Sequence, residues 1–152
     1  MVCTFQFQNT SVLTLVTCAV EWHRKYLMLS HPSRWWREVE WSFPEGMIHD
    51  GESARVAAFR TLREEAGIDA PGEPIHCGCW QCTEADEGRE YVLLLFHFED
   101  KPMIHVTHGA CEAFCWMPDP HTQMQEHRLD MTNRDKAFFE KAEQVAERIY
   151  VH

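Results

Sequence analysis

Basic residues are scarce in this sequence, and it contains no long apolar run. The 152 residues include 14 Lys and Arg against 24 Asp and Glu, which gives a formal net charge of −10 at pH 7. Binding along a nucleic-acid backbone needs clustered Lys and Arg, so the charge argues against a nucleic-acid polymer as the partner. No apolar stretch is long enough to cross a bilayer, and we expect no membrane partner. A phosphorylated small molecule stays compatible, because a bound divalent cation reverses the local sign of the field.

We also expect no signal peptide. The first residues, MVCTFQFQNT, have neither a basic start nor a continuous apolar core. Seven cysteines make an odd number, which does not suit a framework of paired disulfides. We therefore expect a cytoplasmic protein with mostly free thiols. The length predicts one domain over residues 1–152.

The stretch GMIHDGESARVAAFRTLREEAGI, from Gly46 to Ile68, combines a glycine-bounded loop with a predicted helix. Ser53 suits the helix N-cap, because its hydroxyl can accept a bond from a free backbone N–H group. Gly67 suits the position after the last turn, because glycine tolerates a left-handed backbone. The two residues bound roughly four turns of helix.

This helix carries two adjacent carboxylates, Glu64 and Glu65, three and four residues after Thr61. These spacings place the three side chains on neighbouring parts of one helix surface. Two carboxylates side by side repel each other in isolation. The arrangement becomes useful when a hard cation such as Mg²⁺ lies between carboxylate and phosphate oxygens.

The stretch resembles the Nudix box, G-x5-E-x7-R-E-U-x-E-E-x-G-U, in which U is apolar. Eight of its nine specified positions agree, and the lead-in Phe43-Pro44-Glu45-Gly46 is similar to that of the family. The one departure is Thr61, where the family has a glutamate. The matching residues are Gly46, Glu52, Arg60, Leu62, Glu64, Glu65, Gly67 and Ile68.

The resemblance implies an α/β fold, a Nudix-type α/β/α sandwich with a mixed central sheet and one helix on each face. The predicted order of strands, helix, strands and helix is consistent with that architecture. Periodicity and turn residues predict strands at 12–20, 26–29, 75–83, 91–98 and 111–117, and a last helix that begins near 132–135. We also expect the wide apolar surface of the first helix to be clamped between the sheet and a loop.

The resemblance also implies a metal site on the first helix. Glu64 and Glu65 are the expected ligands of Mg²⁺ or Mn²⁺, and Glu52 contributes directly or through water. Arg60 would orient Glu52 through a bidentate ion pair. Gly46 would let the backbone come close to the metal and the substrate phosphates.

The implied reaction is hydrolysis of a diphosphate linkage in a nucleotide-type small molecule, such as a nucleoside triphosphate, a nucleotide sugar or a dinucleoside polyphosphate. Thr61 is neutral and cannot act as a general base near neutral pH. Either Glu64, Glu65 or Glu112 takes that role, or the chain is a catalytically impaired nucleotide-binding or interaction module. The family also contains many homodimers, although no interface is recognisable in this sequence.

Three further residues are candidates for the site. Glu112, four residues before Trp116, matches a carboxylate that many family members recruit from outside the box; the alternative is a strand-edge glutamate without a special role. Trp35 and Trp36 precede the glycine loop, where an aromatic ring can stack on a nucleobase. For these two indoles and for Trp41, which could stack in the same way, the alternative is that they only pack the loop against the sheet.

Cysteines and histidines give no clear ligand motif. Cys79 and Cys82 form one C-x-x-C pair, which would suit zinc, but the spacing is not that of two paired knuckles. Cys77 and Cys79 are expected to share one face of a strand, which favours buried thiols. His121 and His127 lie in a polar segment, where contact with phosphate and simple solvation are both open.

Overall fold

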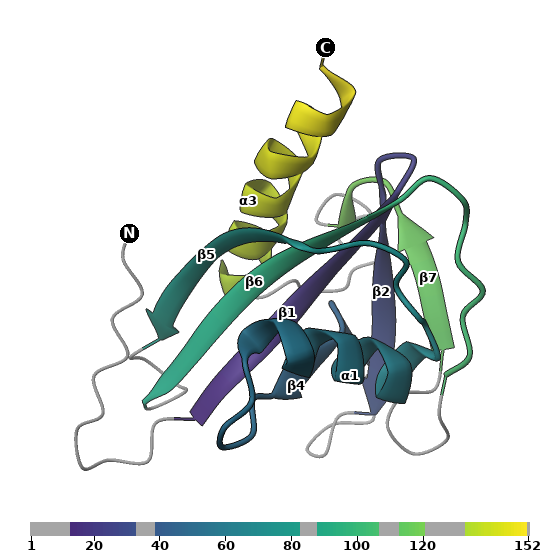
Figure 1. Ribbon diagram of the computed structural model, residues 1–152. Helices are drawn as coiled ribbons and strands as arrows, with labels where there is room; N and C mark the ends of the chain where they lie inside the picture. The colour runs from purple at the N-terminus through teal and green to yellow at the C-terminus, as the bar shows by residue number, and fades with distance from the viewer. Residues whose placement is uncertain (1–12, 33–38, 83–87, 107–112, 121–132, 152) are drawn as a thin grey trace.

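The computed structural model describes residues 13–32, 39–82, 88–106, 113–120 and 133–151. Within these ranges the chain forms a sheet and two helices (Figure 1). The strands are β1 (Leu13–Trp22), β2 (Lys25–Pro32), β3 (Val39–Ser42), β4 (Glu45–Met47), β5 (Ile75–Cys82), β6 (Arg89–Phe98) and β7 (Ala113–Met117). The helices are α1 (Ala54–Ala66) and α3 (Asn133–Tyr150).

Strand β1 is the centre of the sheet, whose order is β3-β2-β1-β6-β5. It runs parallel to β6 along its whole length and antiparallel to β2 and β4. Strand β5 pairs with β6 in the antiparallel direction, and β7 pairs with β2. The predicted mixed sheet is therefore confirmed.

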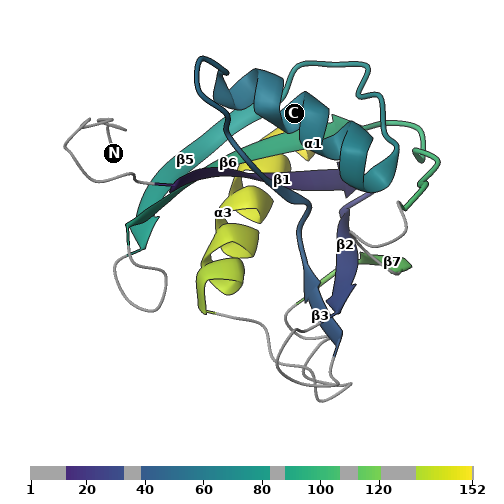
Figure 2. The same cartoon turned by 90° about the horizontal axis from the view of Figure 1, so that it is seen from below.

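The two helices cover opposite faces of β1 and β6, as Figure 2 shows. Val16, Leu62 and Leu94 belong to an apolar cluster under α1, whereas Leu93 and Phe138 belong to a second cluster under α3. Neighbouring residues of one strand thus serve different cores, because successive strand side chains point to opposite faces. This arrangement confirms the predicted α/β/α sandwich.

Helix α1 begins and ends where its capping residues predict. The hydroxyl of Ser53 accepts a bond from the Val56 N–H at 3.1 Å, and Gly67 adopts a left-handed φ of 65°. The backbone N–H of His105 donates to the carbonyl of Ala66 at 2.8 Å. Ile104 and Val106 pack against the cluster under α1. Residues 104–106 therefore hold the end of the helix against the sheet, and this loop is the clamp that the sequence predicts.

Some local predictions are wrong. The strand predicted at 26–29 is longer than expected, because β2 continues through Pro32, which pairs with Val39. At Pro32 only β3 pairs with β2 among the described residues, and proline is tolerated at such an edge position. Strands β3 and β4 are too short to show a pattern in the sequence.

The cysteine pattern also differs from expectation. Cys77 packs in the cluster under α3, whereas Cys79 packs against the cluster under α1. The pairing register shifts between His76 and Gly78, and this irregularity places the two cysteines on opposite faces. Cys77, like Cys18 and Cys115, is free, as predicted, but Cys79 is disulfide-bonded.

Candidate active site

The guanidinium group of Arg60 joins the β4–α1 loop to the helix. Its Nε donates to Glu52 Oε2 at 2.9 Å, and its Nη2 donates to Glu52 Oε1 at 2.8 Å. Its guanidinium also donates to Glu64 Oε2 at 3.2 Å and to the Met47 carbonyl at 2.5 Å. Hydrogen bonds from Arg60 and from the His49 N–H lower the pKa of Glu52 to about 2. Glu52 is thus an anion at every physiological pH.

The two adjacent glutamates of α1 have different environments. The Glu64 side chain is 61% exposed beside Arg60. Glu65 is largely buried, and its Oε2 accepts a 3.2 Å hydrogen bond from the Glu45 backbone N–H. Burial raises the pKa of Glu65 to about 7, with smaller contributions from the charges of Glu45 and Glu64. A cation bound next to Glu65 would stabilise the charged form of its carboxylate and lower this pKa.

Thr61 occupies a closed position under Gly46. Its side chain is 1% exposed, and a Cβ atom added to Gly46 would lie 2.1 Å from Thr61 Oγ1. Only glycine permits this close approach of β4 to the helix. Thr61 Oγ1 is buried and has no hydrogen-bond partner among the described residues. The hydroxyl therefore has no access to a solvent water that it could orient or activate.

The donor set of the site is composed of oxygen atoms. Among the described residues, no three His, Cys, Asp or Glu side chains gather around one point. Mg²⁺ is usually held by one or two carboxylates together with water and substrate phosphates, so Glu64 and Glu65 fit this ion without a complete protein cage. Hard carboxylate oxygens also suit Mn²⁺ and disfavour a soft metal.

Three predicted site residues, Glu112, Trp35 and Trp36, lie outside the described residues, as do His121 and His127. Trp41, by contrast, is on β3 and packs partly buried against the cluster under α3. This location matches the packing interpretation of Trp41.

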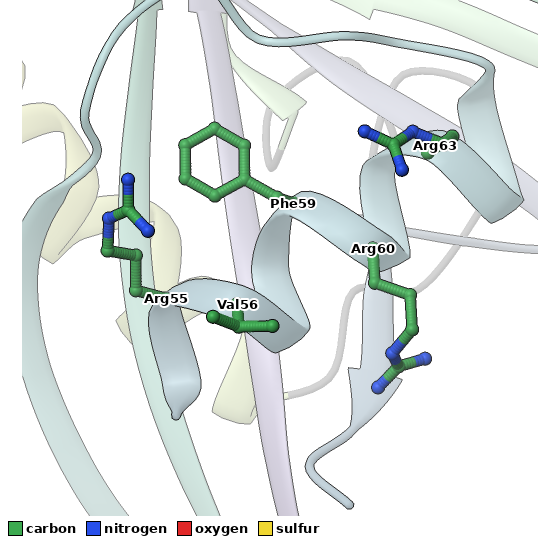
Figure 3. Close-up of a pocket in the computed structure, with 5 residues that line it drawn as sticks. All are labelled: Arg55, Val56, Phe59, Arg60 and Arg63. Atoms are coloured by element: carbon green, nitrogen blue, oxygen red, sulfur yellow. The ribbon is translucent and has the colours of Figure 1, made fainter. Parts of the chain in front are cut away.

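A shallow pocket of about 390 Å³ lies on the outward face of α1 (Figure 3). In Figure 3 Arg55 lies beside Phe59, and its guanidinium carbon is 4.9 Å from the ring centroid. Arg55 also binds Glu73 through two hydrogen bonds, and Arg63 donates to Asp69 at 3.1 Å. These pairs balance the positive charge of the pocket. Its lining residues are Arg55, Val56, Phe59, Arg60 and Arg63.

Glu45 is a residue of the site that sequence patterns did not predict. Its Oε2 accepts a 3.0 Å bond from Thr17 Oγ1 and forms an ion pair with Arg134 at 3.8 Å. Burial raises the pKa of Glu45, and the neighbouring Arg134 opposes that rise. Its place directly before Gly46 was the only available signal, because Thr17 and Arg134 are distant in sequence.

The fold and the α1 carboxylates agree with a family match. A sequence model described as the NUDIX domain matches residues 13–141, which is most of the chain. The chain therefore belongs to the NUDIX family. This membership supports the predicted class, a hydrolase that acts on phosphoanhydride bonds.

Solved structures share the fold. The NUDIX domain of Shewanella oneidensis NrtR, solved with ADP ribose, is 15% identical with a TM-score of 0.71, over 92% of this chain and 90% of that one. The E. coli ORF135 protein is 26% identical with a TM-score of 0.63, over 85% and 86% of the two chains. A C. elegans Ap4A hydrolase is 14% identical with a TM-score of 0.69, over 90% and 98%. No curated protein matches the chain.

Proposed function

We propose that the chain is a divalent-metal-dependent pyrophosphohydrolase that cleaves a diphosphate linkage in a nucleotide-type small molecule. The observation that carries the proposal is the Arg60 network, which brings Glu52 and Glu64 to one guanidinium. Glu65, the next residue of the helix, accepts a bond from the β4 backbone. A helix without metal chemistry gains little from crowding these charges, because exposed ion pairs contribute only about 0–1 kcal/mol each.

Each residue has a distinct task in this proposal. Glu64 and Glu65 hold Mg²⁺ or Mn²⁺, and Glu52 completes the site directly or through water. Arg60 keeps Glu52 oriented, because residues that hydrogen-bond a metal-binding side chain fix its position. Gly46 lets β4 lie close to α1, because the space that a side chain would need is filled by Thr61. The ion would supply charge neutralisation on the phosphoryl oxygens and a lower pKa for an attacking water.

The water-activating base is a residue other than Thr61, because the Thr61 hydroxyl is neutral and buried. A carboxylate can take this role if it reaches the same water. Glu64 is exposed beside the metal position, and Glu112 is a second candidate. The substrate class includes nucleoside triphosphates, nucleotide sugars and dinucleoside polyphosphates. The solved NrtR domain in complex with ADP ribose and the Ap4A hydrolase support a search among diphosphate-linked nucleotides.

The test is release of nucleoside monophosphate or phosphate from a panel of these nucleotides with Mg²⁺ or Mn²⁺. We expect the wild type to turn over one class and Glu64→Gln to lose at least about tenfold in kcat. Glu73→Gln is the matched control, because it removes a carboxylate from an arginine pair on the outward face of α1. Equal turnover by Glu64→Gln and the wild type would contradict the metal role of Glu64.

The second candidate function is a nucleotide-binding module without turnover, and the buried, neutral Thr61 favours it. Thr61→Glu separates the two functions. A wild type that binds a nucleotide but releases no product, together with a Thr61→Glu variant that does release it, would establish a binding module. A thermal melt of each variant must accompany the assay, because the longer side chain crowds Gly46.

A further inference from the structure

We propose that Glu45 is a positioning residue that fixes the metal ligand Glu65 and links it to helix α3. The proposal rests on the proposed function, since it assumes that Glu65 binds the metal. Glu45 lies on the short strand β4, directly before Gly46, and touches three elements: strand β1, helix α1 and helix α3.

The side chain and the backbone of Glu45 act on opposite sides of β4. The Gly46 backbone faces Thr61 of α1, so the preceding side chain points to the α3 face of the sheet. There its carboxylate meets Thr17 and Arg134. The backbone N–H of the same residue binds Glu65. A residue held by its side chain therefore presents its N–H group to a metal ligand.

The anchors of the Glu45 carboxylate are themselves well fixed. Thr17 is fully buried on β1 and faces Glu45 in the pairing of β1 with β4. Arg134, in the first turn of α3, hydrogen-bonds the Tyr91 hydroxyl, and its guanidinium carbon lies 4.5 Å from the centroid of that ring. Tyr91 is fully buried on β6. The two anchors thus connect Glu45 to the rigid centre of the sheet.

Strand β4 has three residues, and it meets α1 at three points: the Glu45 N–H on Glu65, the Gly46 backbone against Thr61, and the Met47 carbonyl, which accepts from Arg60. The Glu45 carboxylate adds the contacts of this strand with Thr17 and Arg134 on the other side. Loss of the carboxylate would let the β4 backbone shift, and the N–H group would no longer hold Glu65 in place. Removal of a residue that hydrogen-bonds and orients a metal ligand commonly weakens metal affinity by about 10–100-fold.

The test is Mn²⁺ binding by electron paramagnetic resonance in the absence of substrate, with thermal melts of the same metal-free samples. We expect Glu45→Ala to weaken Mn²⁺ binding by about tenfold or more. Glu45→Gln should lose less, because its amide oxygen still accepts from Thr17 while the ion pair with Arg134 is gone. Glu73→Ala is the matched control and should bind as the wild type does.

Each outcome separates the inference from the proposed function. A purely structural role of Glu45 would lower the melting temperature and leave Mn²⁺ affinity of the folded protein unchanged, which would overturn the inference. A wild type that binds no Mn²⁺ would overturn the proposed function itself. If Glu45→Ala does not fold, the graded comparison of Glu45→Gln with Arg134→Lys decides: wild-type affinity in both overturns the inference, and weaker binding in both supports it.

Discussion

At the scale of single residues, the site depends on how one helix distributes its polar side chains between water and the interior. Glu64 is exposed, Glu65 is largely buried and Thr61 is closed off, although all three lie within five positions. The chemical difference from the Nudix box is thus a buried hydroxyl in place of a charge. It removes one carboxylate from the site and leaves the other two in unlike environments.

Thr61→Val is expected to stabilise the protein. Thr61 Oγ1 is buried and lacks a partner among the described residues, so it carries a desolvation cost without a hydrogen bond in return. Replacement by a methyl group of similar size should raise the free energy of unfolding by about 1 kcal/mol and leave turnover unchanged. Urea denaturation and the hydrolysis assay check both parts. A loss of turnover in Thr61→Val would show that the hydroxyl takes part in the reaction.

Glu65 should make the metal-free protein less stable as the pH rises. The pKa of its carboxyl is about 7 when folded, against an ordinary value of 4.5. Between these values the folded state keeps a proton that the unfolded chain has lost, so stability falls from about pH 4.5 to about pH 7 and then levels off for this group.

Glu65→Gln should remove this part of the pH dependence. At pH 8 the metal-free variant should be more stable than the wild type, by an amount on the order of 1–3 kcal/mol. Denaturation curves at pH 5 and pH 8 in the presence of a chelator measure the difference. A wild type and a variant with parallel pH profiles would show that Glu65 is not held in its neutral form.

At the scale of elements, two arginines of α1 join the helix to different partners. Arg60 spans Glu52, Glu64 and the Met47 carbonyl. Arg55, on the same helix, pairs with the exposed Glu73. Arg60 bonds to the loop, to its own helix and to the candidate metal ligands, whereas Arg55 bonds to none of these ligands. Substitutions of the two arginines can therefore be compared directly.

Arg60→Lys should weaken metal binding by about tenfold, because a lysine cannot reproduce the bidentate bonds to Glu52. Arg55→Lys should change metal binding little, and the loss of its exposed pair should cost about 0–1 kcal/mol of stability. Mn²⁺ titration and urea denaturation of both variants make the comparison. Equal Mn²⁺ affinities of Arg60→Lys and the wild type would contradict the orienting role of Arg60.

At the scale of the whole molecule, the sequence predicted the architecture because long elements carry strong patterns. Apolar strands such as β1 and β6, and the Ser53 and Gly67 caps of α1, are local signals of this kind. The short strands β3 and β4 and the register shift in β5 depend on pairing between distant segments, and no local pattern records them.

The sequence likewise predicted only the local part of the candidate site. The bidentate Arg60–Glu52 pair was implied by the resemblance to the Nudix box. The unequal burial of Glu64 and Glu65 and the contacts of Glu45 could be seen only in the fold, because they depend on how α1 and α3 meet β4.

No helix in the described part of the chain is long and apolar enough to cross a membrane.

Phosphorus NMR of a diphosphate-linked nucleotide mixed with the protein, with and without Mg²⁺, tests the central claim most directly. The nucleotide is the class that the substrate panel identifies. We predict that new monophosphate signals appear only with Mg²⁺, that Glu65→Gln reduces their rate at least about tenfold, and that Glu73→Gln does not. Cleavage that proceeds equally in a chelator, or equally in Glu65→Gln, would contradict the assignment of the α1 carboxylates as the metal site.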